Sequence, residues 1–311
     1  MVTPTQYNAC IGNAFLLSEY CFHELQRFTM TTKNLQGWLR RKYEATGAFT
    51  RADLLALLVL IGLFVVLAVK SLASGRSYNE ATACLNNHRR LVVAWQMYAD
   101  DNEGRLVGNL DGGGVMGGPP NASRTWVLGW LDFSGGPDNT NTLFLTHYSP
   151  LAPYIGRVAE VFKCPSDLTR SRGSRGEPRV RSYSMNSYQN GRQWTTGFQV
   201  FARSSDFVSI SPSSAFVFIE ESEASINDGY FVVEMTGYPS NPNLERLVDY
   251  PGGYHNDGAV LSFADGHAEP KRWADRRTNL RNGLFFPVPP SPNNPDILWL
   301  QERTTRRVVT Q

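Results

Sequence analysis

A chain of 311 residues with 41% hydrophobic and 12% aromatic residues can bury a large core, which excludes disorder as its main state. Of its 30 basic and 28 acidic residues, five basic and three acidic ones precede Phe49, so 25 of each follow. The part of the chain from Phe49 onward is therefore neutral and has no net field to attract nucleic acid, and we expect no nucleic-acid partner.

Hydropathy is concentrated in one segment near the N-terminus. Leu54 to Val69 is a run of sixteen residues without a polar side chain, and no comparable run occurs elsewhere. This pattern predicts a single membrane-spanning helix within residues 49–73. The basic residues Arg40, Arg41 and Lys42 precede it, so the positive-inside rule places the N-terminus in the cytoplasm and the C-terminal part outside.

The small residues Gly47 and Ala48 lie before the apolar run. An ordinary secretory signal has its cleavage site after the apolar run, which is then discarded. The reverse order predicts that residues 1–48 are a leader and that the apolar helix stays with the mature chain. Met30 is an alternative start, which would give a shorter basic leader.

The segment FTRADL, residues 49–54, resembles the cleavage and methylation site of type IV prepilins and type II secretion pseudopilins. The resemblance implies cleavage by a prepilin peptidase before Phe49, methylation of the new N-terminus, and anchoring in a bacterial inner membrane. It also implies that the Asp53 carboxylate pairs with the amine of a neighbouring subunit, since a charge in an apolar bundle needs a partner. An uncleaved signal anchor, with Arg51 and Asp53 satisfying each other, is the alternative.

Residues 74–104 change from apolar to amphipathic, because Cys84, His88, Leu91 and Trp95 recur at spacings of three and four. This predicts a helix that packs one face on the exported domain and ends near residues 102–104. Without a proline from 49 to 102, the two segments are expected to form one long helix.

Residues 105–311 alternate short apolar runs with turn residues, which predicts an antiparallel β-sheet. The expected fold is therefore α+β, with a long N-terminal helix packed on a β-rich domain. The expected strands are 125–133, 158–163, 215–220, 230–235, 259–263 and 267–273. The arginine-rich stretch 170–181 is interpreted as a solvated loop.

A second resemblance involves His255, nine intervening residues, and Asp265-Gly266 in the stretch YHNDGAVLSFADGHAEPKRW. It is similar to the C-terminal H-X9-DG signature of a large group of bacterial prepilin-like proteins. CLNN at 84–87, FKCPSD at 162–167 and RSYSMN at 181–186 resemble that group in the same order. The combined resemblance covers residues 49–273.

The densest group of candidate metal ligands is His255, Asp257, Asp265, His267 and Glu269. An Asp-Gly pair between two strands is what a hairpin turn requires, so a structural use of His255, Asp265 and Gly266 is favoured. A metal site with His255, Asp265 and His267 is the weaker alternative. Without an activated nucleophile or a paired-carboxylate motif, we expect no enzymatic activity.

Two further sets of residues leave alternatives open. Asp100, Asp101, Asn102 and Glu103 offer oxygen ligands for calcium, but their spacing does not match an EF-hand, and a hydrated helix end is favoured. Cys84 and Cys164 are either a disulfide in an oxidising compartment or two buried free thiols.

The expected function is a structural subunit of a type IV pilus or a type II secretion pseudopilus. Its partners would be a prepilin peptidase, other pilin-like subunits and the inner membrane, with the C-terminal domain periplasmic or extracellular. The alternative is a membrane-tethered module that binds a glycan or surface polymer through Trp126, Trp130 and Trp194. A tethered metal-dependent hydrolase rests only on residues 255–269.

Overall fold

The fold is that of a computed structural model, which describes residues 50–116, 118–279 and 289–308. The chain divides into two units, Met1–Ser71 and Leu72–Gln311, and each is described by itself. The expected leader and the expected processing residues Gly47, Ala48 and Phe49 lie outside the described residues.

In the first unit, helix α3 (Arg51–Asp101) begins with a reciprocal cap. The Thr50 backbone N–H donates to Asp53 Oδ2 at 2.9 Å, and the Asp53 N–H donates to Thr50 Oγ1 at 3.2 Å. This arrangement satisfies two amide groups that a helix start would otherwise leave open, which is why the helix begins here. Its segment Arg51–Val69 is long and apolar enough to cross a membrane and is not buried.

The part of α3 in the second unit is amphipathic, as expected. Cys84, His88, Leu91 and Trp95 lie on its buried face, spaced by three or four residues. The helix ends where Gly104, at a φ of +78°, donates its N–H to the Ala99 carbonyl at 2.8 Å. A residue with a side chain adopts that conformation at a cost, so the glycine terminates the helix.

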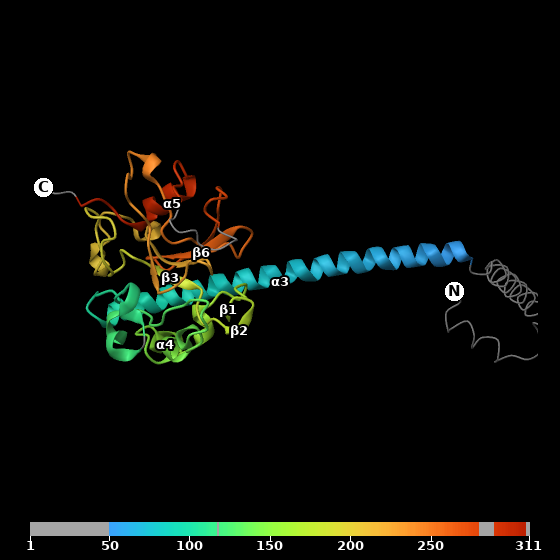
Figure 1. Cartoon of the computed structure of the whole chain (residues 1–311), viewed down its shortest axis with the longest axis horizontal. Helices are drawn as coiled ribbons and strands as arrows, with labels where there is room; N and C mark the ends of the chain where they lie inside the picture. Colours follow the sequence, from blue (N-terminus) through green and yellow to red (C-terminus); the bar gives the residue numbers. More distant parts are fainter. Residues whose placement is uncertain (1–49, 117, 280–288, 309–311) are drawn as a thin grey trace, which may run out of the picture. The chain divides into compact units, whose positions relative to one another are not determined.

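The second unit contains a five-stranded sheet in the order β5-β3-β4-β6-β7. Figure 1 labels β3 and β6 of this sheet. Its strands are β3 (Tyr183–Asn186), β4 (Phe216–Glu220), β5 (Tyr230–Phe231), β6 (Gly258–Phe263) and β7 (Ala268–Arg272). The α+β class is confirmed, but the sheet is mixed, because β5 pairs parallel to β3. Strand β5 runs opposite to β4 and reaches the far side of β3 through a short loop, so no crossover helix is needed.

The expected strands near 215–220, 259–263 and 267–273 are confirmed as β4, β6 and β7. Those at 125–133 and 158–163 are wrong: the first has no regular strand, and the second is the 3-10 helix η5 (Ala159–Phe162). Both runs are apolar because their side chains fill the core, and Gly129 at a φ of +99° interrupts the first. Burial alone does not specify a strand.

Both faces of the sheet are buried along β3, β4, β5 and β6. Along β6, Ala259, Leu261 and Phe263 pack into one core cluster, which contains Leu300 of helix α5 (Pro295–Thr304). Val260 packs into a second cluster, which contains the buried face of α3. Successive strand residues point to opposite faces, so β6 contributes to both of these clusters.

The arginine-rich stretch is not a solvated loop throughout. It forms a two-stranded hairpin, β1 (Arg170–Arg172) with β2 (Arg175–Pro178), and then turns inward. Arg179 and Arg181 are buried, and Arg181 donates to the backbone carbonyls of Tyr183 and Asp228 at 2.9 and 2.7 Å. Carbonyl acceptors make it tolerable to bury these guanidinium groups, which the sequence pattern did not reveal.

The remaining helices are short and connect the larger elements. Helix α5 is capped by Asn294, whose side chain accepts from the Asp296 N–H at 2.9 Å. The others are α4 (Leu143–Thr146) and the 3-10 helices η1 (Gly112–Val115), η2 (Pro119–Arg124), η3 (Pro137–Asn139), η4 (Ala152–Ile155), η6 (Ser204–Asp206), η7 (Pro212–Ser214) and η8 (Pro242–Leu244).

Candidate functional site

The Asp265-Gly266 pair forms the turn between β6 and β7, as the sequence predicts. Gly266 has a φ of +96°, and its N–H donates to the Phe263 carbonyl at 2.9 Å. Asp265 Oδ1 accepts from the His267 N–H at 3.1 Å and contacts His267 Nδ1. The turn is docked on α3 by Gln96, which donates to the Ala264 carbonyl at 2.9 Å. The contacts of these residues are those of a hairpin turn.

His255 lies at the other end of β6. It precedes the first residue of that strand, whereas Asp265 follows the last, and a six-residue strand spans roughly 20 Å. The structure therefore does not bring His255 together with Asp265 and His267. His255 instead points into the core, where Nε2 lies 3.3 Å from Cys164 Sγ and 3.1 Å from Glu220 Oε1.

Four potential ligands meet at this point: Cys84, Cys164, Glu220 and His255. Their ligand atoms all lie within 4.8 Å of one another, and among the described residues no other group of three or more His, Cys, Asp or Glu does so. The Cys84 thiol donates to Glu220 Oε1 at 2.7 Å. Both cysteines are buried free thiols. We call these four residues the buried cluster.

The buried cluster carries charge inside the protein. Burial would raise the pKa of Glu220, but hydrogen bonding to His255 and its positive charge outweigh burial and lower the pKa. Burial would likewise lower the pKa of His255, but contacts with Cys164 and Glu220 outweigh it and raise that pKa to about 10. For Cys84, burial raises the pKa well above its usual range. In this state the cluster contains an imidazolium–carboxylate pair beside a neutral Cys84 thiol.

Neighbouring groups fix the orientation of the buried cluster. Glu220 Oε2 accepts from the Val260 N–H at 2.7 Å, so its other oxygen faces the thiol and the imidazole. The Cys164 N–H donates to Ser182 Oγ at 3.2 Å, and the Tyr183 hydroxyl contacts Cys84 Sγ at 3.2 Å. These contacts hold four side chains from distant parts of the chain in one place.

His88 lies one helical turn after Cys84 and is fully buried. Its ring is tilted by 55° against that of Tyr183, with centroids 4.2 Å apart, and neither ring nitrogen has a hydrogen-bond partner among the described residues. Burial lowers its pKa to about 4, so the ring is neutral at pH 7.

From the sequence, Cys84 and Cys164 were expected as a disulfide or as two free thiols, and His255 in a different group; Glu220 was not expected at the site. The available signal was weak. Glu220 ends an otherwise apolar run, FVFIE, and a carboxylate at the end of a fully buried strand needs a partner. That partner is distant in the sequence, so the pattern alone could not identify it.

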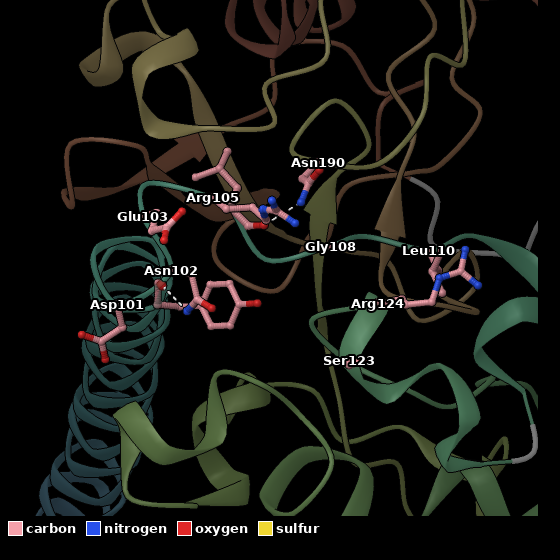
Figure 2. A pocket seen from close by; sticks show the side chains of 11 residues that line it. Asp101, Asn102, Glu103, Arg105, Gly108, Leu110, Ser123, Arg124 and Asn190 are labelled. Atoms are coloured by element: carbon pink, nitrogen blue, oxygen red, sulfur yellow. Dashed lines mark hydrogen bonds between the residues drawn. The ribbon is translucent and has the colours of Figure 1, made fainter.

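A pocket of about 610 Å³ lies at the C-terminal end of α3 (Figure 2). Asp101, Asn102 and Glu103, three of the four candidate calcium ligands, line it with Arg105 and Arg124. Figure 2 shows the carboxylates of Asp101 and Glu103 pointing in different directions. Asp101 accepts from the Tyr154 hydroxyl at 2.9 Å, outside the lining of the pocket. The pocket has two arginines and divergent acids, which is a poor arrangement for a calcium ion.

A second pocket, of about 510 Å³, is lined by Trp130, Trp194 and Tyr230 together with carboxylates, including Asp111 and Asp228. We call it the tryptophan pocket. Trp194 is 40% exposed. The third candidate, Trp126, is not available at a surface: it is fully buried and stacks on Phe162 of η5, with ring centroids 6.0 Å apart.

Comparison with protein-family models, curated proteins and solved structures gave no match to this chain. Three features of the molecule bear on its function: the apolar part of α3, the buried cluster and the tryptophan pocket. The first is a surface, the second is closed, and the third is open to solvent.

Proposed function

We propose that the chain is a pilin-like subunit, held in a bacterial inner membrane by the apolar part of α3 and carrying its second unit on the exported side. One observation supports this most. Within the described chain, the large apolar side chains from Leu54 to Val69 are each 44% or more exposed. Its function would be mechanical, without catalysis.

The exposed apolar surface argues for a nonaqueous environment. Soluble monomers rarely leave a continuous apolar patch of this size in water. Arg51–Val69 has the length of a membrane span, and lipid or the same helix of neighbouring subunits would cover its surface. The reciprocal cap leaves the Asp53 carboxylate exposed at the start of this helix, where a cationic partner could reach it.

Processing is tested by identifying the N-terminal residue of protein recovered from membranes of cells with and without a prepilin peptidase. A methylated Phe49 that depends on the peptidase is the expected result. An intact leader in both strains would contradict the pilin-like function and would leave an uncleaved anchor.

Assembly is tested separately with Asp53→Ala and Asp53→Glu, followed by cross-linking of subunits in membranes. If Asp53 pairs with the amine of a neighbour, Asp53→Ala loses cross-linked multimers while staying in the membrane, and Asp53→Glu retains them. Equal multimers in both variants would contradict the assigned pairing.

The tryptophan pocket favours a second candidate function, binding of a glycan or surface polymer. It combines aromatic faces with carboxylates in a concavity of ligand size, which is typical of small-molecule sites. Trp194→Ala should abolish retention of purified cell-wall glycan. Tyr78→Ala, an exposed aromatic outside the pocket, is the matched control and should retain it. Equal retention by both variants would contradict this function.

A further inference from the structure

The buried cluster unites four segments that lie far apart in the sequence. Cys84 comes from α3, Cys164 follows η5, Glu220 ends β4, and His255 precedes β6. Two thiols, an imidazole and a carboxylate are ligands that zinc takes in proteins. Their potential ligand atoms lie within 4.8 Å of one another.

The spacing of these atoms is close to that of a tetrahedral zinc site. With zinc–sulfur distances of about 2.3 Å and zinc–nitrogen or zinc–oxygen distances of about 2.0 Å, neighbouring ligand atoms lie about 3.3 to 3.8 Å apart. Cys164 Sγ to His255 Nε2 is 3.3 Å, and His255 Nε2 to Glu220 Oε1 is 3.1 Å. Cys84 Sγ to Glu220 Oε1 is shorter, 2.7 Å. Ligand movements of about 1 Å or less would therefore admit the ion.

The hydrogen bonding of the cluster indicates a common centre. His255 Nε2 faces both a sulfur and a carboxylate oxygen, although a ring nitrogen carries one proton at most. Glu220 Oε1 is shared between the imidazole and the Cys84 thiol. A single cation would satisfy these convergent lone pairs together, whereas protons can satisfy them only in part.

We propose that Cys84, Cys164, Glu220 and His255 form a binding site for a zinc ion. All four positions are filled by buried protein side chains, so the site is of the closed, structural kind and leaves no position for a reactant. The ion would fasten α3 to the sheet and to the loop after η5. This inference does not depend on membrane anchoring or on leader cleavage.

Outer contacts would support the ligands. Val260 holds one oxygen of Glu220, which leaves the other free for the ion, and the Tyr183 hydroxyl lies in position to donate to a Cys84 thiolate.

The same cysteines could instead form a disulfide, so the test must separate the two states. The full chain is purified in mild detergent without chelators, its zinc content is measured by mass spectrometry, and its thiols are alkylated before and after chelation under denaturing conditions. We expect about one zinc ion per chain and thiols of Cys84 and Cys164 that react only after chelation. A Cys84–Cys164 disulfide with zinc at background would overturn the proposal, as would free thiols at Cys84 and Cys164 with zinc at background.

Variants assign the ligands. His255→Ala and Cys164→Ser should each weaken zinc binding at least about tenfold, whereas His267→Ala, an exposed histidine outside the cluster, should bind as the unaltered chain does. Equal loss in His267→Ala would overturn the assignment. Since ligand variants can fail to fold, the unaltered chain is also loaded with cobalt. Thiolate-to-cobalt charge-transfer bands are expected, and their absence counts against the site.

Discussion

The Cys84 thiol lies 2.7 Å from Glu220 Oε1, which joins the buried face of α3 to the end of the central strand β4. Glu220 also accepts from Val260 on the neighbouring strand β6 and contacts His255 beyond it. A single carboxylate therefore connects the helix, two strands and a loop. The Glu220 side chain is fully buried, so each of these contacts replaces a hydrogen bond to water that the carboxylate makes in the unfolded chain.

We predict that Glu220→Ala destabilises the second unit by about 3 to 5 kcal/mol, because it leaves the buried partners of the carboxylate uncompensated. The measurement is urea denaturation of the full chain in detergent, followed by circular dichroism. Glu269→Ala removes an exposed carboxylate from β7 and should change stability by less than about 0.5 kcal/mol. Similar losses in the two variants would contradict the importance of the cluster.

Gly229→Ala is expected to destabilise the core by about 1 to 3 kcal/mol. An added Cβ at this position would lie 2.5 Å from Val127 Cγ1 and 2.7 Å from Trp126 Nε1. The Gly229 carbonyl also accepts from that indole N–H at 2.9 Å, so a shift would break a buried hydrogen bond. Denaturation followed by tryptophan fluorescence measures the loss.

Gly113→Ala is the matched control for this substitution. Its added Cβ meets nothing within 4 Å, and its backbone is outside the left-handed region. The change should be neutral or stabilise by up to about 1 kcal/mol through the unfolded chain. If Gly113→Ala costs as much as Gly229→Ala, close packing is not the cause.

The stability of the second unit should fall in acid partly through Glu234. Burial would raise the pKa of Glu234, but hydrogen bonds from Thr236, Thr195 and Arg246 outweigh burial and lower the pKa to about 2. A depressed native pKa contributes stability that is fully present above the unfolded value of 4.5 and is lost as pH falls toward 2. The contribution at neutral pH is at most about 3 kcal/mol.

Unfolding free energies of the unaltered chain and Glu234→Gln, measured from pH 7 to pH 2.5, test this expectation. The difference between them should be largest at neutral pH and should shrink below about pH 4.5. Glu177→Gln, on the exposed strand β2, is the control and should show no such trend. A constant difference across the range would exclude Glu234 as a source of acid lability.

Local signals in the sequence identified the apolar span, the amphipathic face of α3 and the β6–β7 hairpin. Asp265-Gly266 needs only its own backbone conformation and two flanking strands to be recognised. The cap at Thr50 and Asp53 is equally local, although Asp53 was expected to pair with a neighbouring subunit or with Arg51. In each case the determining contacts are separated by a few residues, so the pattern carries the information.

Contacts between distant segments were not predictable in this way. Glu220 and Cys84 are 136 residues apart. The parallel pairing of β5 with β3 depends on the loop between β4 and β5, which carries the chain past β3. Arg181 is of a residue type that usually lies at the surface, and its burial depends on backbone carbonyls that the fold brings to it. Such acceptors have no signature in the sequence, because every residue carries one.

The apolar part of α3 should fail to hold the chain in a membrane when two charges are placed on it. Residues 54–69 include thirteen Leu, Ile, Phe or Val residues, which together favour insertion by about 4 to 8 kcal/mol. Leu60→Arg with Phe64→Arg adds about 5 to 7 kcal/mol of cost on one face of the helix, enough to cancel most of it. Alkaline extraction of membranes should then release the double variant.

The matched control is Val93→Arg with Met97→Arg, which has the same spacing, starts from side chains that are each 44% exposed and lies in the second unit. That control should stay with the membrane, because it leaves the span unchanged. If the Leu60 and Phe64 variant also stays, the helix does not anchor the chain through its apolar surface, and the proposed function loses its main support.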